Sequence, residues 1–233
     1  MLREGLLEAG RLILSGDARV FDAALRTLWV SVAAVAIAAA VGIPLGCLVA
    51  RREFPGRRAL ILCARTAMAF PTAFIGILCY SIFARYGVLG DLKLIYTSWA
   101  IVAGELLLAL PIVFSMTQGS LSGLDRRVAE TARTLGAGPI RTSLAMLSES
   151  RTGVLLGILT ALARCMTELG IAVMVGGNIP GHTRTLAGAI VLETSRGEYE
   201  RGLAMGLILL LMALGVTGIL VILSFERGKE DRT

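Results

Sequence analysis

The hydrophobic residues of this chain lie in long continuous blocks separated by short charged segments. They do not alternate with polar residues, and about 20 consecutive apolar residues are enough for a helix to cross a bilayer. Only helices and closed barrels satisfy their own backbone hydrogen bonds in lipid, and continuous blocks favour helices. The pattern predicts an all-α polytopic membrane protein with five core transmembrane helices, over Leu25–Ala50, Ala59–Phe83, Thr97–Gln118, Thr152–Val175 and Arg201–Phe225.

Two shorter apolar segments do not fit the length of a span. Residues Leu2–Leu14 are amphipathic, with Leu6, Leu7 and Ile13 on one helical face and charged residues opposite. We expect this segment to be a helix at the membrane surface, broken after its end by Ser15-Gly16-Asp17. The segment Arg184–Ser195 is apolar but short, which favours an interfacial or re-entrant helix.

A proline interrupts the second apolar block near its middle. Pro71 lacks a backbone N–H and its ring clashes with the preceding turn, so it kinks or breaks a helix. We therefore expect the second span to bend at this residue.

The charges between the blocks indicate the orientation. Arg51, Arg52, Arg57 and Arg58 follow the first span directly, and such clusters in short loops mark the cytoplasmic side. Over all loops the excess of Lys and Arg on that side is modest. The N-terminus is then outside and the C-terminus cytoplasmic. The predicted parts are an N-terminal interfacial amphipathic helix (1–23), a transmembrane domain (24–225) with a cytoplasmic loop (121–151), and a cytoplasmic tail (226–233).

Composition supports the membrane assignment and excludes other classes. The chain has 233 residues, of which 55% are hydrophobic, and its mean hydropathy is +0.76. The net charge of +6 belongs to loops of a membrane protein, so we do not interpret it as nucleic-acid binding. The cysteines lie within apolar blocks and form no C-x-x-C pair, which indicates neither a disulfide framework nor a zinc site.

The sequence also lacks the motifs of membrane enzymes. It contains no G-x-x-x-x-G-K-[ST] loop, so we expect it to bind no ATP, and no H-E-x-x-H. Its single histidine, His182, and all its aspartates lie outside the predicted spans. We predict no catalytic residue, no metal ligand and no bound cofactor, which leaves transport as the function class. A gradient-driven secondary transporter would usually show inverted repeats, and none is visible.

The polar loop between the third and fourth spans contains a short amphipathic stretch. Its alanines permit close approach to a partner, Glu130 and Arg133 could pair across a rim, and Gly136 suits a left-handed helix cap. It is either a docking helix for a partner or an ordinary solvated loop helix. The residues expected to dock are Ala129, Glu130, Thr131, Ala132, Arg133, Gly136 and Ala137.

This stretch resembles a motif of ABC importer permeases, whose cytoplasmic loop reads E-A-A-x-x-x-G and is followed by I-x-L-P. Glu130-Thr131-Ala132-Arg133-Thr134-Leu135-Gly136 matches the first half, with Thr131 at the second position. Met146-Leu147-Ser148-Glu149 stands in place of the second half and does not match it.

The remainder of the chain resembles one branch of these proteins, the permeases of tungstate-type ABC importers. The resemblance covers the chain from about Leu25 to its end and includes Ala163-Arg164 with Glu168 and Gly170, Val175-Gly176-Gly177-Asn178-Ile179, Thr183-Arg184-Thr185-Leu186, and Leu192-Glu193-Thr194 with Gly197-Glu198. The related molybdate permeases share the Arg-x-x-x-Glu helix.

The resemblance implies the type I ABC importer permease fold and a homodimer in the plasma (inner) membrane of a bacterium or archaeon. It implies two ABC ATPase subunits on the cytoplasmic side, which would bind ATP and Mg²⁺, and an oxyanion-binding protein outside. The expected function is non-catalytic import of tungstate or molybdate by alternating access. A permease of the same fold for sulfate or phosphate is the alternative.

Ionisable residues in the spans are candidates for the translocation pathway. Arg164 and Glu168 are four residues apart and share a helix face, and charged groups at membrane depth usually face an interior or a water-filled cavity. They line the pathway or form a structural ion pair. Glu105 could pair with Arg65 or Arg164 or face the cavity. Thr160 and Thr167 complete the predicted pathway, although hydroxyls in spans often bond the preceding turn.

The outer segment after the fourth span is the predicted dock for the binding protein. The alternative is a plain connecting loop. The residues expected there are Gly177, Asn178, Thr183, Arg184 and Glu193.

Overall fold

The computed structural model describes the backbone of residues 2–230 and the side chains of residues 3–218. Every regular element in this part is a helix, as predicted. The α-helices are α1 (Leu2–Leu14), α2 (Ala18–Arg51), α3 (Arg57–Ala67), α4 (Thr72–Phe83), α5 (Ser98–Ser122), α6 (Arg126–Thr134), α7 (Pro139–Glu149), α8 (Arg151–Met166), α9 (Gly170–Gly176), α10 (Leu186–Ser195) and α11 (Tyr199–Glu230), and a 3₁₀ turn, η1, covers Gly90–Leu92.

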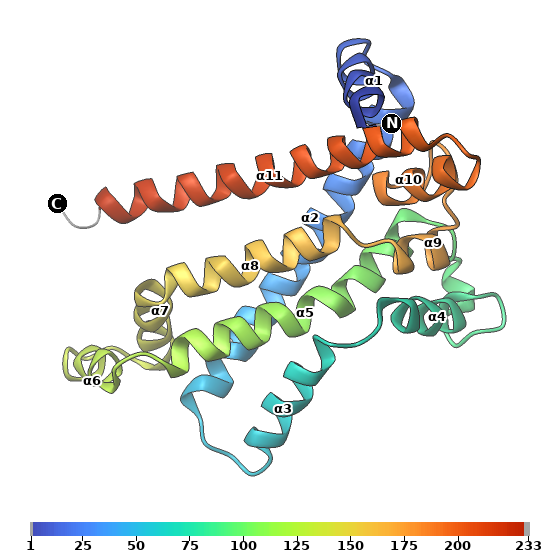
Figure 1. Ribbon diagram of the computed structural model, residues 1–233. Coiled ribbons are helices and arrows are strands. Elements are labelled where there is room, and N and C mark those ends of the chain that lie inside the picture. The colour runs from blue at the N-terminus through green and yellow to red at the C-terminus, as the bar shows by residue number, and fades with distance from the viewer. Residues whose placement is uncertain (1, 231–233) are drawn as a thin grey trace.

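The number of spans agrees with the sequence. Among the described residues, α2, α5 and the first part of α11 are each long and apolar enough to cross a membrane, and the count reaches five when the bent pairs α3–α4 and α8–α9 are taken as one span each. Figure 1 shows the chain passing back and forth, with α6 and α7 at one end and α4, α9 and α10 at the other. Successive connections between the spans therefore lie at alternating ends of the molecule, as a five-span chain requires.

Two of the five spans are broken rather than continuous. The α3–α4 pair bends by 100°, with Pro71 at the N-terminus of α4, which confirms the predicted bend. The α8–α9 pair, which covers the predicted span Thr152–Val175, bends by 56°, and the sequence analysis did not predict this bend. No proline marks this second break. The backbone N–H of Ile171 bonds the Glu168 side chain there, a contact that only the folded chain reveals.

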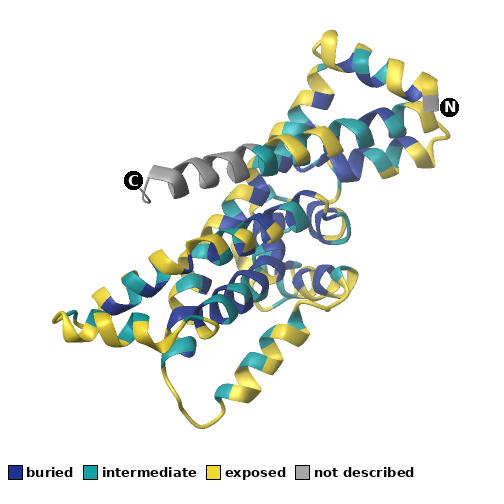
Figure 2. Cartoon of the chain, turned by 60° about the vertical axis from the view of Figure 1, so that its left-hand side comes forward, coloured by how far each residue is buried: buried dark blue, intermediate teal, exposed yellow. Residues whose placement is uncertain are grey.

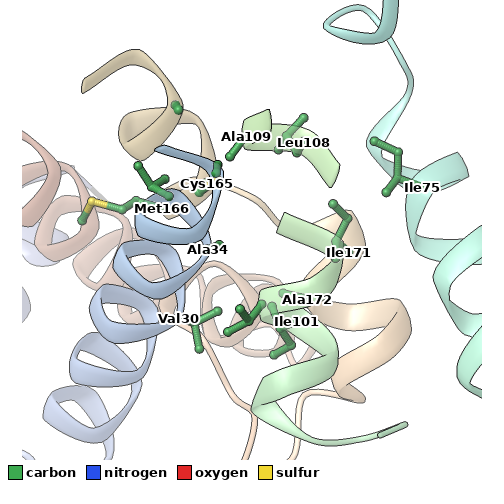
Figure 3. Close-up of a cluster of buried hydrophobic side chains, with 14 of the residues drawn as sticks. Val30, Ala34, Ile75, Ile101, Leu108, Ala109, Cys165, Met166, Ile171 and Ala172 are labelled. Carbon is green, nitrogen blue, oxygen red and sulfur yellow. The ribbon is translucent and has the colours of Figure 1, made fainter. Parts of the chain in front are cut away.

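Helix α2 packs closely along α5 because small residues line the contact. A Cβ atom on Gly46 would lie 2.9 Å from the backbone oxygen of Phe114, so the two backbones approach each other at this point. Figure 3 shows part of the buried cluster that these helices share with their neighbours, with side chains such as Val30, Ile101 and Ile171 contributed by α2, α5 and α9.

The N-terminal helix and the break after it are confirmed, and the structure adds the face by which the helix packs. Gly5, Ala9 and Leu12 are buried and α1 lies against α11, whereas Leu6 and Leu7 are 59% and 66% exposed. The apolar face of α1 is thus free for lipid, and its placement at the membrane surface stays a prediction.

Two helix ends do not coincide with the predicted divisions of the chain, which stay predictions. Asp17 caps α2, whose first turn therefore begins at Ala18, inside the segment assigned to the interfacial helix. At the other end α11 continues to Glu230, so most of the predicted cytoplasmic tail extends the last helix, and residues 231–233 lie outside the described part.

Exposure differs strongly between the helices (Figure 2). Helices α3 and α6 contain no buried residue, whereas more than half of the residues of α5 are buried. Near the start of α5, Trp99 forms an edge-to-face pair with Trp29 of α2, with ring centroids 5.6 Å apart. Exposed tryptophans at one level of a helical bundle are typical of a membrane interface.

Candidate functional site

The break between α8 and α9 is organised by one carboxylate. Arg164 donates a hydrogen bond of 2.9 Å to Oε2 of Glu168, and Oε1 of Glu168 accepts 3.1 Å from the backbone N–H of Ile171. Glu168 is thereby tied to the last turn of α8 through one oxygen and to the first turn of α9 through the other. The predicted Arg164–Glu168 pair exists, and it sits at the elbow of a broken span.

The second broken span meets this elbow. A Cβ atom on Gly170 would lie 3.2 Å from the backbone nitrogen of Ala73, the hydroxyl oxygen of Thr72 and Oε1 of Glu168. The first turn of α4, just after Pro71, therefore touches the first turn of α9. Broken helices that meet within a bundle are a recurring construction of solute sites in transporters.

Glu105 lies in the interior beside this region. Its residue exposure is 2%, and the nearby polar groups are the hydroxyl of Ser31, the thiol of Cys165 and the carboxylate of Glu168. Its Oε2 atom is buried without a hydrogen-bond partner, and no ion pair to Arg65 or Arg164 forms within the described residues. The pairings considered from sequence are thus absent, and Glu105 faces the protein core.

The two threonines of the predicted pathway have exposed side chains with local partners. The Thr160 hydroxyl donates to the backbone oxygen of Leu156 at 2.7 Å, and the Thr167 hydroxyl donates to that of Ala163 at 3.1 Å. Both therefore bond the preceding turn, as hydroxyls in helices commonly do.

The predicted docking helix is α6, and its two ends are well defined. Asp125 caps its first turn by accepting a hydrogen bond from the backbone N–H of Arg127 at 2.9 Å. At its end Gly136 has φ +80°, its N–H bonds the oxygen of Arg133, and the N–H of Ala137 bonds the oxygen of Ala132. This pair of bonds is a Schellman cap, so the left-handed cap predicted at Gly136 is confirmed.

Helix α6 presents most of its surface to the outside. Glu130, Thr131 and Arg133 are exposed, whereas Ala129 and Ala132 are half-buried and Ala137 follows them after the cap. Helix α7 packs beside α6, and the sequence had not indicated this second helix in the loop. The pair forms a projecting end of the molecule that is suited to a partner (Figure 1).

At the opposite end, the loop after α9 is held by its own side chains. The Thr183 hydroxyl donates to the oxygen of Gly176 at 2.5 Å and accepts from the N–H of Ile179 at 3.0 Å. Asn178 donates to the oxygen of Gly188 at 2.9 Å, and Arg184 bonds both oxygens of Asn178. This loop is therefore a compact folded unit rather than a plain connection.

Burial divides the five residues of the predicted dock. Thr183 and Glu193 are 1% and 7% exposed, so neither side chain is free to contact a partner. Asn178 and Arg184 are half-buried and Gly177 is exposed. Desolvation by burial lowers the pKa of the Arg184 guanidinium, and the neighbouring cation Arg196 adds to this effect.

Arg26 is a supporting residue that the sequence did not single out. From α2 it bonds the carboxylate of Asp22 at 2.7 Å, the backbone oxygen of Gly181 at 2.8 Å, and that of His182. Gly181 and His182 are separated from Arg26 by about two-thirds of the chain, so no local pattern signals the contact. Within the described residues no group of three or more His, Cys, Asp or Glu side chains is placed to hold a metal ion.

The geometry thus combines a projecting helix pair, two broken spans that meet, and a folded loop at the far end. The family model described as "Binding-protein-dependent transport system inner membrane component" matches residues 42–228. The chain is 30% identical over 225 residues to the tungstate uptake system permease protein TupB of Peptoclostridium acidaminophilum, covering 97% of this chain and 99% of that protein.

Two further relatives extend the comparison. A probable anion ABC transporter permease protein of Haloferax volcanii is 33% identical over 198 residues, covering 83% of this chain and 85% of that protein. The molybdenum transport system permease protein ModB of Escherichia coli K12 is 28% identical over 222 residues, covering 91% and 96%. The similarity to each of these proteins extends over most of both chains.

Proposed function

The chain belongs to the family of inner membrane components of binding-protein-dependent transport systems, and from this premise we propose that it is the permease subunit of an ATP-driven importer of tungstate or molybdate. The observation that carries the proposal is the similarity, over almost the entire length of both chains, to a tungstate uptake permease. The molybdenum permease similarity supports the same class of substrate, a tetrahedral oxyanion.

The α6–α7 end is the proposed dock for two ATPase subunits, one on each chain of a homodimer. The exposed side of α6 offers Glu130, Thr131 and Arg133, and the cap at Gly136 fixes the helix end that a partner groove would meet. Closure of the ATPase dimer on ATP would move the two α6 helices together and turn the pathway outward.

The proposed pathway passes the elbow of α8 and α9. Arg164 is the cation there, and its side chain is 41% exposed while that of its partner Glu168 is 2% exposed. A dianion held by an uncompensated cation would leave slowly, whereas a cation already neutralised by Glu168 offers weak and reversible attraction. Thr167, whose hydroxyl is exposed one residue before Glu168, adds a polar group beside it.

The opposite end, with the loop after α9, is the proposed outer face and dock for an oxyanion-binding protein. Its firm internal hydrogen bonds keep the backbone in one shape, which suits a surface that must be recognised repeatedly. In this orientation the N-terminus lies outside and α6 lies in the cytoplasm.

Co-purification is the first test of this function. The tagged chain is solubilised gently from native membranes, and the proteins that accompany it are identified by mass spectrometry. We expect a P-loop ATPase in an amount equal to that of this chain, and tungstate uptake by the reconstituted complex that requires ATP. A chain that purifies alone and moves solute in vesicles without ATP would instead be a gradient-driven carrier, and uptake of sulfate in preference to tungstate would reassign the substrate.

A further inference from the structure

A pocket of about 630 Å³ lies at the end of the molecule that carries α6 and α7. Its walls come from the last turns of α2 and from α7, and Arg133 of α6 reaches its rim. We propose that this pocket binds an anionic phospholipid, with the phosphate of the headgroup on the arginines and an acyl chain along the apolar walls.

The charge of the pocket fits a phosphate. Its lining contains Arg51, Arg52 and Arg133 and no acidic residue. Within the described residues no carboxylate forms an ion pair with any of the three. Guanidinium groups bind phosphate oxygens through paired, charge-assisted hydrogen bonds, so three of them on one rim favour a phosphate ester.

Arg51 supplies the most specific feature of this rim. Its Nη1 donates to the backbone oxygen of Pro139 at 2.6 Å and to the hydroxyl of Ser143, which fixes the guanidinium against α7. Its Nε is buried and has no hydrogen-bond partner. The fixed guanidinium keeps its positive charge at the pocket wall, where a phosphate can pair with it.

The walls fit an acyl chain rather than a small anion. Leu48 of α2 is 46% exposed, and Ile140 and Leu144 of α7 are 77% and 60% exposed, all lining the same pocket. A free oxyanion would leave these aliphatic side chains uncovered. A phospholipid covers them and occupies the arginines at the same time, which is why we assign the anion to a lipid.

The position of the pocket matches the membrane surface. It lies where the apolar part of the spanning helix α2 ends and the arginine-rich segment from Arg51 to Arg58 begins. Headgroups of anionic lipids attract such juxtamembrane cations. This inference does not depend on which solute the protein transports.

A bound lipid at this site would join α2 to the helix pair α6–α7. Arg133 belongs to α6 and Arg51 to α2, and one phosphate between them bridges the spanning core to the helix that projects from it. Anionic lipid would then stabilise the position of α6.

Lipid binding to the delipidated transporter complex, measured by native mass spectrometry, tests the proposal. We expect phosphatidylglycerol to bind and phosphatidylcholine to be displaced by it. Arg52→Ala should weaken phosphatidylglycerol binding about fivefold, the equivalent of about 1 kcal/mol for one cation near an anionic headgroup. The matched control is Arg58→Ala, which removes an exposed arginine in the first turn of α3 that does not line the pocket.

A second variant tests the apolar part of the pocket without changing charge. Leu144→Trp should fill the pocket and reduce lipid binding, whereas Leu156→Trp on α8, which is 50% exposed and outside the pocket, should not. Equal binding of the two lipids, equal effects of Arg52→Ala and Arg58→Ala, or displacement of the lipid by millimolar inorganic phosphate would overturn the proposal. A photoreactive phosphatidylglycerol that labels no peptide of α2 or α7 in the complex would also overturn it.

Discussion

Arg164 and Glu168 form a hydrogen-bonded ion pair of 2.9 Å across the break between α8 and α9, and the two partners differ sharply in exposure. The Glu168 side chain is 2% exposed and also caps α9, while the Arg164 side chain is 41% exposed. Glu168 therefore stabilises the first turn of α9, which Arg164 does not contact in this way. Arg164 is the exposed member of the pair and the one that a passing anion could contact.

Removing the cation alone should destabilise the protein. Arg164→Met leaves the buried carboxylate of Glu168 without its counter-charge, at a cost of about 2 kcal/mol, below the value for a fully buried pair because Arg164 is partly exposed. A lower midpoint of thermal unfolding in detergent is the expected result.

The double replacement separates structure from transport. Arg164→Met with Glu168→Gln removes both charges and retains an amide oxygen for the N–H of Ile171, so we expect the unfolding midpoint to recover while uptake stays low. Uptake that recovers together with stability would show that the pair serves packing alone.

Gly136 should matter for coupling more than for folding. Its φ is +80°, and a Cβ atom added there would meet no other atom within 4 Å, so Gly136→Ala adds backbone strain of about 1 kcal/mol and no clash. Gly136→Trp adds bulk on the docking end as well, and we expect it to abolish ATP-dependent uptake. Gly123→Ala, in the same loop at φ −84°, is the control and should behave as the wild type. Normal uptake by Gly136→Trp would argue against α6 as the ATPase dock.

Position 105 should tolerate a neutral side chain of the same size but not a longer, positively charged one. Glu105→Gln keeps the shape of the side chain, and because no cation pairs with Glu105 among the described residues, no counter-charge is left unpaired. We expect an unchanged or slightly raised unfolding midpoint. Glu105→Lys places a cation among buried apolar residues and should abolish the folded yield. A large loss of stability in Glu105→Gln would contradict this expectation, because it would mean that the carboxylate is paired with a cation.

The contact between α5 and α9 depends on the absence of a side chain at Gly104. A Cβ atom there would overlap the Cγ2 atom of Ile171, so Gly104→Ala should cost about 2 kcal/mol by overpacking. Adding Ile171→Ala provides room and should restore part of the loss, which a double-mutant cycle measures. Gly119→Ala, on the same helix with no neighbour within 4 Å, is the control.

Thiol labelling in intact cells tests the orientation. In a variant without the native cysteines, Val88→Cys and Leu135→Cys introduce thiols at positions that are 92% and 82% exposed, at opposite ends of the molecule. A membrane-impermeant maleimide should label the Val88→Cys thiol from outside and the Leu135→Cys thiol only after permeabilisation. The reverse pattern would invert the proposed topology.

Much of the architecture was predictable because it depends on local chemistry. Long apolar blocks predict spans since lipid leaves the backbone no other partner, and Pro71 predicts a bend because of its missing N–H. Gly136 predicts the end of α6 because glycine adopts a left-handed conformation at little cost. The pairing of Arg164 with Glu168 follows from their helical spacing.

The contacts between distant segments were not predictable from any one stretch. Arg26 bonds the backbone of Gly181 and His182, and Arg51 bonds the backbone of Pro139, although each pair is far apart in the chain. The burial of Thr183 and Glu193, which removed them from the predicted docking surface, likewise depends on what packs over them.

The sequence by itself determined the class of protein, the number of spans and the position of the projecting helix, because hydropathy and helix caps act over a few neighbouring residues. Only the tertiary structure decided that α8 and α9 are separate helices, that α4 meets them at Gly170, and that Arg51, Arg52 and Arg133 share one pocket. These features depend on contacts between side chains of separate helices. The spacing of residues along one helix does not predict such contacts.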